Sequence, residues 1–249
     1  MDRFELLYTE LKNRCPELEL RKEEPMSRHT SFHIGGPARL MALPKTAQEA
    51  AQALRGACEL GVEPFFMGNG SNLLVSDRGV ERFLVKAGLG FDRCWLEGTD
   101  LVAESGISLA RLAVFARDNG LTGLEFAHGI PGTLGGAVNM NAGAYGGEMA
   151  QVVREVVCLN RNGEEETVTD FDFGYRRSAF SNGSRMILRV RLALQPGDRD
   201  TIRARMEELA AQRQAKQPLE YPSAGSMFKR PVGYFAGALI EQRSEGAHV

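Results

Sequence analysis

Apolar residues spaced three or four positions apart predict helices in several parts of the chain. The first helix lies near the N-terminus, where Phe4, Leu7 and Leu11 share one helical face. Thr46 and Glu49, three residues apart, have the pattern of an N-terminal capping box. Further helices are predicted over residues 46–61, 108–120 and 200–213.

Short apolar runs between turn residues predict strands. They cover residues 39–43, 62–67, 82–86, 101–104, 153–159 and 186–194. Asn162-Gly163 is a strong signal for a hairpin turn. Helices and strands alternate early in the chain and the middle is rich in strands, so a mixed α and β fold is expected. A turn at residues 195–197 marks a boundary, and the predicted parts are 1–92, which includes the N-terminal helix, 93–197 and 198–249.

Composition places the chain among ordinary globular proteins. Its 249 residues are 43% hydrophobic and 25% charged, which is enough apolar material for a core and too much for intrinsic disorder. The net charge of −2 argues against nucleic-acid binding, which needs a basic excess. The cysteines form no C-x-x-C pair, no apolar run approaches the length of a membrane span, and the charged N-terminus lacks a signal-peptide core. We therefore expect a cytoplasmic protein with reduced thiols.

A tight turn, Gly68-Asn69-Gly70-Ser71-Asn72, follows a predicted buried strand. It differs from a Rossmann dinucleotide-binding turn, because Leu73 stands at the third glycine position and the next residues are β-like rather than helical. Two interpretations remain open. The glycines can expose backbone N–H groups as an anion-binding nest, or the segment is a plain β-turn.

A second segment, Gly129–Tyr145, mixes glycines with Ile130, Leu134 and Val138. It is too apolar for a flexible linker, so we expect it to be buried. Small residues in a buried segment indicate one of two situations. Either a large flat or charged ligand approaches the backbone closely, or backbone packs tightly on backbone.

Two more segments place cations beside small or aromatic residues. Tyr175–Phe180 contains two arginines, which could grip a carboxylate or phosphate or could be solvated charges at a strand end. Ser223–Pro231 is a small-residue turn that ends in two cations, and Ser226 within it could instead be a helix N-cap. The histidines have no metal-ligand spacing, we expect no metal, and no G-x-S-x-G, H-E-x-x-H or Walker motif occurs.

Several separated motifs agree in order and spacing with one known family. They are His29–Phe32, Gly35–Ala38, Gly68–Val75, Gly123–Phe126, Gly129–Tyr145, Tyr175–Phe180 and Pro222–Pro231. The chain resembles the UDP-N-acetylenolpyruvoylglucosamine reductases, flavoenzymes that complete UDP-N-acetylmuramic acid for bacterial peptidoglycan. The resemblance covers about residues 25–241 and is far more specific than any single motif.

The resemblance implies an α+β FAD-binding fold of the vanillyl-alcohol-oxidase (PCMH) type, built from two subdomains and followed by a truncated α+β substrate domain. It implies bound FAD, NADPH as reductant, a nucleotide-sugar substrate and a monomer. The implied FAD contacts are Gly68, Asn69, Gly70, Ser71, Asn72, Leu73, Gly132, Gly135, Gly136, Ala137, Asn141, Ala142 and Gly143.

The resemblance also implies roles at the reaction centre. Arg176 matches the family's arginine that stabilises the substrate carboxylate as charge builds on it. Ser226 matches the family's serine that delivers a proton to the carbanionic carbon, for which a serine must be well positioned. Tyr175 and Lys229 are the implied substrate contacts.

The end of the sequence departs from the family pattern. After Ala236–Glu241 the family continues through a glycine-rich stretch that supplies a catalytic glutamate, whereas residues 242–249 of this chain have no counterpart to that glutamate. This implies a truncated product in which FAD binding survives better than catalysis. The interpretations are therefore an active reductase, or an FAD-binding remnant without turnover. A third, an oxidoreductase of another sugar or alcohol on the same flavin fold, is disfavoured by the Arg176 and Ser226 motifs.

Overall fold

The computed structural model describes residues 2–244, apart from positions 89, 218, 226, 227, 230, 232 and 235. The helices are α1 (Arg3–Arg14), α2 (Ala47–Glu59), α3 (Leu109–Asp118), α4 (Leu134–Asn139), α5 (Arg199–Lys216) and α6 (Ala236–Ser244), with short 3-10 turns η1 (Met26–Arg28), η2 (Glu125–Ala127) and η3 (Met149–Gln151). The longer strands are β1 (Glu19–Pro25), β2 (Pro37–Leu43), β3 (Pro64–Met67), β4 (Val80–Lys86), β5 (Cys94–Glu97), β6 (Asp100–Glu104), β10 (Val153–Asn160), β11 (Glu165–Val168) and β12 (Arg185–Ala193). Two-residue strands are β7 (Leu121–Thr122), β8 (Gly143–Ala144), β9 (Gly147–Glu148) and β13 (Gln195–Pro196).

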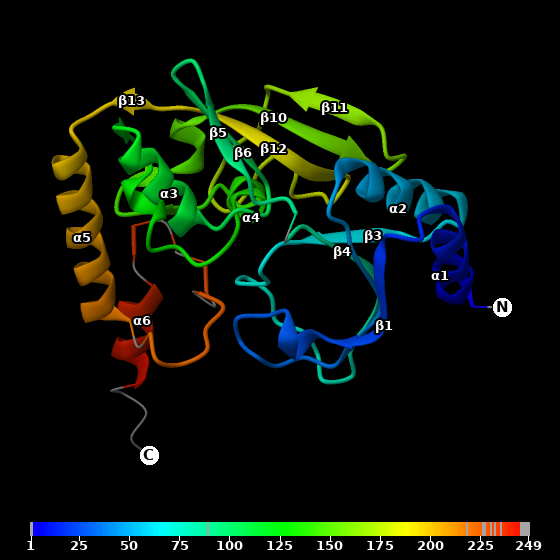
Figure 1. Ribbon diagram of the computed structural model, residues 1–249. Helices are drawn as coiled ribbons and strands as arrows, with labels where there is room; N and C mark the ends of the chain where they lie inside the picture. The colour runs from blue at the N-terminus through cyan, green and yellow to red at the C-terminus, as the bar shows by residue number, and fades with distance from the viewer. Residues whose placement is uncertain are drawn as a thin grey trace.

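The first sheet has the strand order β1-β2-β4-β3. β2, β4 and β3 run parallel, and β1 joins them as an antiparallel edge strand. Helices α1 and α2 pack against one face through a core that includes Leu7, Leu54 and Phe83 (Figure 1). A smaller apolar cluster around Met41 and Leu84 covers the opposite face. The loops that follow β1 and β3 therefore start from a rigid, two-sided sheet.

The second sheet has the order β11-β10-β12-β6-β5 and is antiparallel throughout. Helices α3 and α4 pack on one face (Figure 1). From the other face, Val157, Leu159 and Leu188 join the core beneath α2. The hairpin turn after β10 lies so close to α2 that a Cβ on Gly163 would be 2.4 Å from the carbonyl oxygen of Ala51. The two sheets are thus packed firmly against each other through α2.

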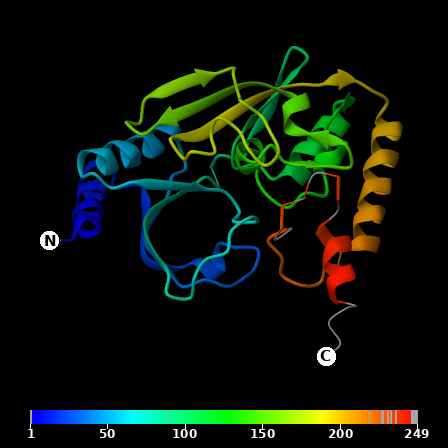
Figure 2. The ribbon, with the colours of Figure 1, turned by 180° about the vertical axis from the view of Figure 1, so that it is seen from behind.

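The third part of the chain begins with α5, which lies along the side of the second sheet's helices (Figure 1). The segment between α5 and α6 then returns toward the loops of the first sheet, and both views show this path (Figures 1 and 2). The return is fixed by a hydrogen bond from the Ser31 hydroxyl to the carbonyl of Ser223. Within the described ranges, no helix is long and apolar enough to cross a membrane.

The helices and strands predicted from apolar spacing are confirmed, with shifts of a few residues at their ends. β11, α6 and the two-residue strands were not predicted, and neither were β1, β5 and α4. β1 is a charged edge strand with little apolar alternation, β5 is a short strand, and α4 is hidden by its glycines. The capping box is half confirmed, because Thr46 accepts from the Glu49 amide at 3.1 Å while the Glu49 carboxylate accepts from Lys45 rather than from Thr46.

We expect Thr46→Ala to lower the free energy of unfolding by about 1 kcal/mol, because it removes the hydroxyl that caps α2. Thr46→Ser keeps that acceptor and should stay within about 0.5 kcal/mol of the wild type. Urea denaturation followed by circular dichroism measures both. Equal stability of the alanine and serine variants would contradict a capping role for Thr46.

Candidate functional site

The turn that leaves β3 has closely packed glycines, with Gly68 half-buried and Gly70 buried, and backbone amides without acceptors. Among the described residues, the backbone N–H groups of residues 69–73 find no acceptor. Gly70 has φ +63°, and a Cβ there would lie 2.1 Å from the carbonyl oxygen of His29. The expectation of β structure after the turn is wrong, since residues 73–75 form no strand and Leu73 and Val75 instead pack on the first sheet. The turn therefore offers several amide donors in a place where a side chain would not fit.

The small-residue segment lies against this turn. A Cβ on Gly68 would be 2.2 Å from the Thr133 hydroxyl, and a Cβ on Gly132 would be 3.0 Å from the Ser71 hydroxyl. Thr133 also caps α4 by accepting from the Gly136 amide at 3.4 Å. The amides of Gly132 and Thr133 find no acceptor in the described part of the chain. Two segments some 60 residues apart thus form one surface with donors from both sheets' loops.

The small-residue segment was interpreted either as a place of close ligand approach or as tight backbone packing, and each interpretation has support at different positions. The amides of Gly135, Ala137 and Ala142 donate to backbone carbonyls within the protein, so they are not available to a ligand. A Cβ on Gly135 would lie 2.8 Å from the Cβ of Ser105, and one on Gly143 would lie 2.7 Å from the carbonyl oxygen of Gly147. These glycines are explained by tight packing, whereas Gly132 lies where the two segments meet.

Asn141 was expected to contact the cofactor, but both groups of its side-chain amide form hydrogen bonds within the protein. It is buried with φ +43°, its side-chain amide donates to Gly174 at 3.3 Å and its side-chain oxygen accepts from Ala150 at 2.9 Å. Ser178 adds a second link by donating to the carbonyl of Asn139 at 2.9 Å. Together these contacts fix the turn that contains Tyr175 and Arg176 against the end of α4.

Arg176 lies beside the donor-rich turn. Gly174 and Arg177 exchange backbone hydrogen bonds around it, and Arg176 has φ +54°. Its Nη2 donates to the side-chain oxygen of Asn72 at 2.6 Å, and the Asn72 amide contacts the Met140 sulfur at 3.8 Å. The structure therefore brings together the predicted arginine and the predicted FAD-binding turn, which are 104 residues apart.

The segment that contains Ser226 also approaches the turn. Ser31 donates its amide to the carbonyl of Gly70 at 3.4 Å and its hydroxyl to the carbonyl of Ser223. Ser226 itself lies outside the described residues, and Lys229 and Tyr175 are exposed. The sequence analysis missed Ser31 and Thr133 as contact residues. A threonine directly before Leu134 was a usable N-cap signal, whereas nothing in the sequence pairs Ser31 with residue 223.

This donor set suits FAD. A diphosphate is anionic and binds backbone N–H groups that no other acceptor uses, with glycines allowing close approach. Residues 69–73 and Gly132 provide such amides. The residues that would hold the cofactor are therefore present and grouped.

Comparisons with known proteins identify the family of the chain. Residues 38–169 match the family model described as an FAD binding domain. The chain is 44% identical, over 97% of its length and 80% of the relative's, to UDP-N-acetylenolpyruvoylglucosamine reductase of Geobacillus thermodenitrificans. It is 45% identical to the enzyme of the same name from Caldanaerobacter subterraneus, over 95% of this chain and 79% of that one.

Solved structures show the same relationship. The UDP-N-acetylenolpyruvylglucosamine reductase of Thermus caldophilus superposes with a TM-score of 0.78 at 34% identity, covering 92% of this chain and 80% of that one. A cholesterol oxidase from Brevibacterium sterolicum shares the fold alone, with a TM-score of 0.56 at 14% identity over 73% of this chain and 38% of that one. The expected α+β FAD-binding fold of the vanillyl-alcohol-oxidase type is confirmed. The chain belongs to the UDP-N-acetylenolpyruvoylglucosamine reductase family, and is a flavin-dependent oxidoreductase with FAD as its cofactor.

Proposed function

We propose that the chain reduces UDP-N-acetylglucosamine enolpyruvate to UDP-N-acetylmuramate with NADPH as reductant. The observation that supports this most directly is the contact of Arg176 with Asn72 at 2.6 Å, next to the uncommitted amides of residues 69–73. A substrate carboxylate needs such a fixed cation close to the flavin. The named relatives, at 44% identity over nearly the whole chain, support the same substrate.

The amides of residues 69–73 and Gly132 would hold FAD, which would supply the hydride chemistry between NADPH and the enol ether. Arg176 holds the conjugated carboxylate, and its charge stabilises the negative charge that spreads into that group. Because Asn72 is neutral, its contact orients the guanidinium without cancelling this charge. We propose Ser226 as the proton donor to the adjacent carbon, with Tyr175 and Lys229 contacting the nucleotide sugar.

The parts of the chain divide this work in our proposal. Residues 1–92 and 93–197 hold FAD between them, and residues 198–249 cover the substrate. The two separate sheets and the contact between Ser31 and Ser223 support this division. We place the reaction in the cytoplasm, where NADPH is available, and the monomeric state stays a prediction.

A visible spectrum of the purified chain, followed by NADPH oxidation with and without the enolpyruvyl substrate, tests the proposal. We expect a flavin spectrum and an NADPH oxidation rate that rises on adding substrate. A flavin spectrum with no substrate-dependent oxidation would favour the FAD-binding remnant over the reductase. Since the chain spans 80% of the length of the relatives, flavin content and turnover should be measured on the same preparation.

A further inference from the structure

Three titratable side chains form a row behind the FAD-binding turn, in which Glu24 and His29 are buried and Lys86 is half-buried. Glu24 lies near the end of β1, His29 follows η1, and Lys86 ends β4. His29 Nε2 is 2.9 Å from Glu24 Oε1, and His29 Nδ1 is 3.0 Å from Lys86 Nζ. Glu24 and His29 are only 7% and 8% exposed. Arg21 completes the row by donating to the same Glu24 oxygen at 3.0 Å.

While Lys86 is charged, a single protonation pattern satisfies this row. Burial lowers the pKa of Lys86, and this pattern applies at pH values below that pKa. A lysine ammonium can donate but not accept, so Nδ1 of His29 must be the acceptor. The ring proton then lies on Nε2 and is donated to the Glu24 carboxylate, which makes His29 neutral. A second proton on Nδ1 would face the Lys86 ammonium across 3.0 Å, with no acceptor between two positive charges.

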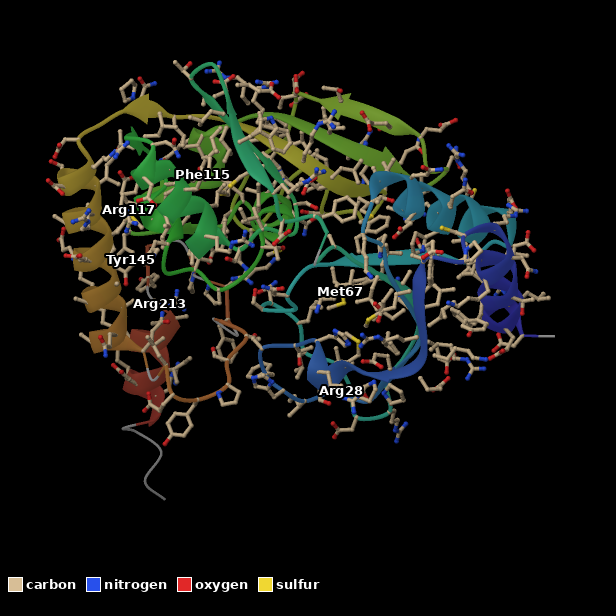
Figure 3. All side chains as sticks on the ribbon, viewed as in Figure 1. Arg28, Met67, Phe115, Arg117, Tyr145 and Arg213 are labelled. Atoms are coloured by element: carbon tan, nitrogen blue, oxygen red, sulfur yellow. The ribbon has the colours of Figure 1, made fainter. Side chains whose placement is uncertain are left out.

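The segments that contain His29 and Lys86 contact the FAD-binding turn directly. The carbonyl of His29 lies against Gly70, and Ser31, two residues on, donates its amide to Gly70 at 3.4 Å. Lys86 pairs in the sheet with Met67, the residue immediately before Gly68. Figure 3 labels Arg28, which directly precedes His29, and Met67, which directly precedes the turn. A shift of the His29 ring away from Lys86 would therefore move the turn.

We propose that His29 is a positioning residue for FAD, whose neutral form holds the Gly68–Leu73 turn in its binding shape and whose protonation releases the cofactor. The inference rests on FAD binding by this chain and not on the proposed substrate. Its readout is FAD affinity, so a failure of substrate reduction and a failure of this inference are separate results.

The direction of the pKa shifts agrees with a neutral His29. Burial lowers the pKa of His29 and Lys86 lowers it further, while the hydrogen bond to Glu24 acts in the opposite sense without cancelling them. The charged groups acting on this ring are Glu24 and Arg21 on β1 and Lys86 on β4. A base with a lowered folded pKa stabilises the fold fully above its unfolded value, about pH 6.5, and loses that contribution as the pH falls through the folded value.

Titration of the apoprotein with FAD between pH 8 and pH 5, followed by flavin fluorescence, tests the inference. We expect a constant Kd above about pH 7 and a rise of about threefold or more by pH 5. His29→Asn keeps an acceptor for Lys86 but cannot be protonated, so its Kd should not depend on pH. His33→Asn is the matched control, because His33 is exposed with φ +55°, which asparagine tolerates, and it should keep the wild-type pH dependence. A pH-independent wild type, or a His29→Asn variant that follows the wild-type curve, would overturn the inference.

Two further variants predict shifts of opposite sign. Lys86→Met removes the cation that opposes protonation, so the midpoint of FAD release should move to higher pH. Glu24→Gln removes the carboxylate that favours protonation, so the midpoint should move to lower pH. Circular dichroism at each pH confirms that the variants are folded. A general loosening of the fold would move both midpoints in the same direction, and that result would overturn the inference.

Discussion

Arg176→Met is expected to lower kcat/KM for the enolpyruvyl substrate by about 10²–10³-fold, since removing one fixed transition-state partner has effects of that size. FAD affinity should change by less than about threefold, because Arg176 contacts only the Asn72 side chain of the turn. The backbone amides of the turn, which we expect to bind the diphosphate, are left unchanged. Substrate-dependent NADPH oxidation measures the first quantity and flavin fluorescence titration measures the second.

Arg177→Met is the matched control for this experiment. Arg177 is the next residue but pairs with the exposed Asp172 at 2.9 Å, away from Asn72. An exposed pair of this kind contributes little, so kcat/KM should stay within about twofold of the wild type. Equal losses in the two arginine variants, or a loss of FAD that matches the loss of activity in Arg176→Met, would contradict a substrate role for Arg176.

The regular part of the fold could be predicted from the sequence because its apolar periodicity is strong. The α2 and β12 segments show why, since each buries a face whose spacing matches its period. β1 could not be predicted in this way, because six of its seven residues are at least partly exposed and its pairing with β2 is set by neighbours far from it in sequence. α4 was missed because its first turn contains Gly135 and Gly136, which have low helix propensity, yet Thr133 caps it and the sheet packs against it.

The candidate site was predicted as separate segments, and its geometry was not. Each motif marks a local backbone requirement, such as the positive φ of Gly70 or the close approach at Gly68. The contact of Arg176 with Asn72 and the row of Glu24, His29 and Lys86 depend on how the sheets and loops pack, so no spacing in the sequence reveals them. Sequence alone also could not separate Gly132, which lies where two loops meet, from Gly135, whose place is explained by packing on Ser105.

Gly70→Ala is expected to weaken FAD binding by about 100-fold, or ~2.7 kcal/mol. Its φ of +63° alone costs an alanine roughly 1–2 kcal/mol of stability. The larger effect comes from position, because the new Cβ would lie 2.1 Å from the His29 carbonyl oxygen, which is backbone and cannot rotate away. The turn must therefore shift, and losing two amide contacts to a charged phosphate at about 1.5 kcal/mol each gives the expected loss.

Gly98→Ala separates the strain of the left-handed backbone from the clash. Gly98 has the same φ of +63°, but a Cβ there would meet nothing within 4 Å. Its variant should lose roughly 1–2 kcal/mol of unfolding free energy and keep wild-type FAD affinity. Urea denaturation and FAD titration of both variants make the comparison. If both glycine variants lost FAD affinity to the same degree, backbone strain rather than the fit of the turn against His29 would control the cofactor site, and the grouping of amides at residues 69–73 would no longer explain FAD binding.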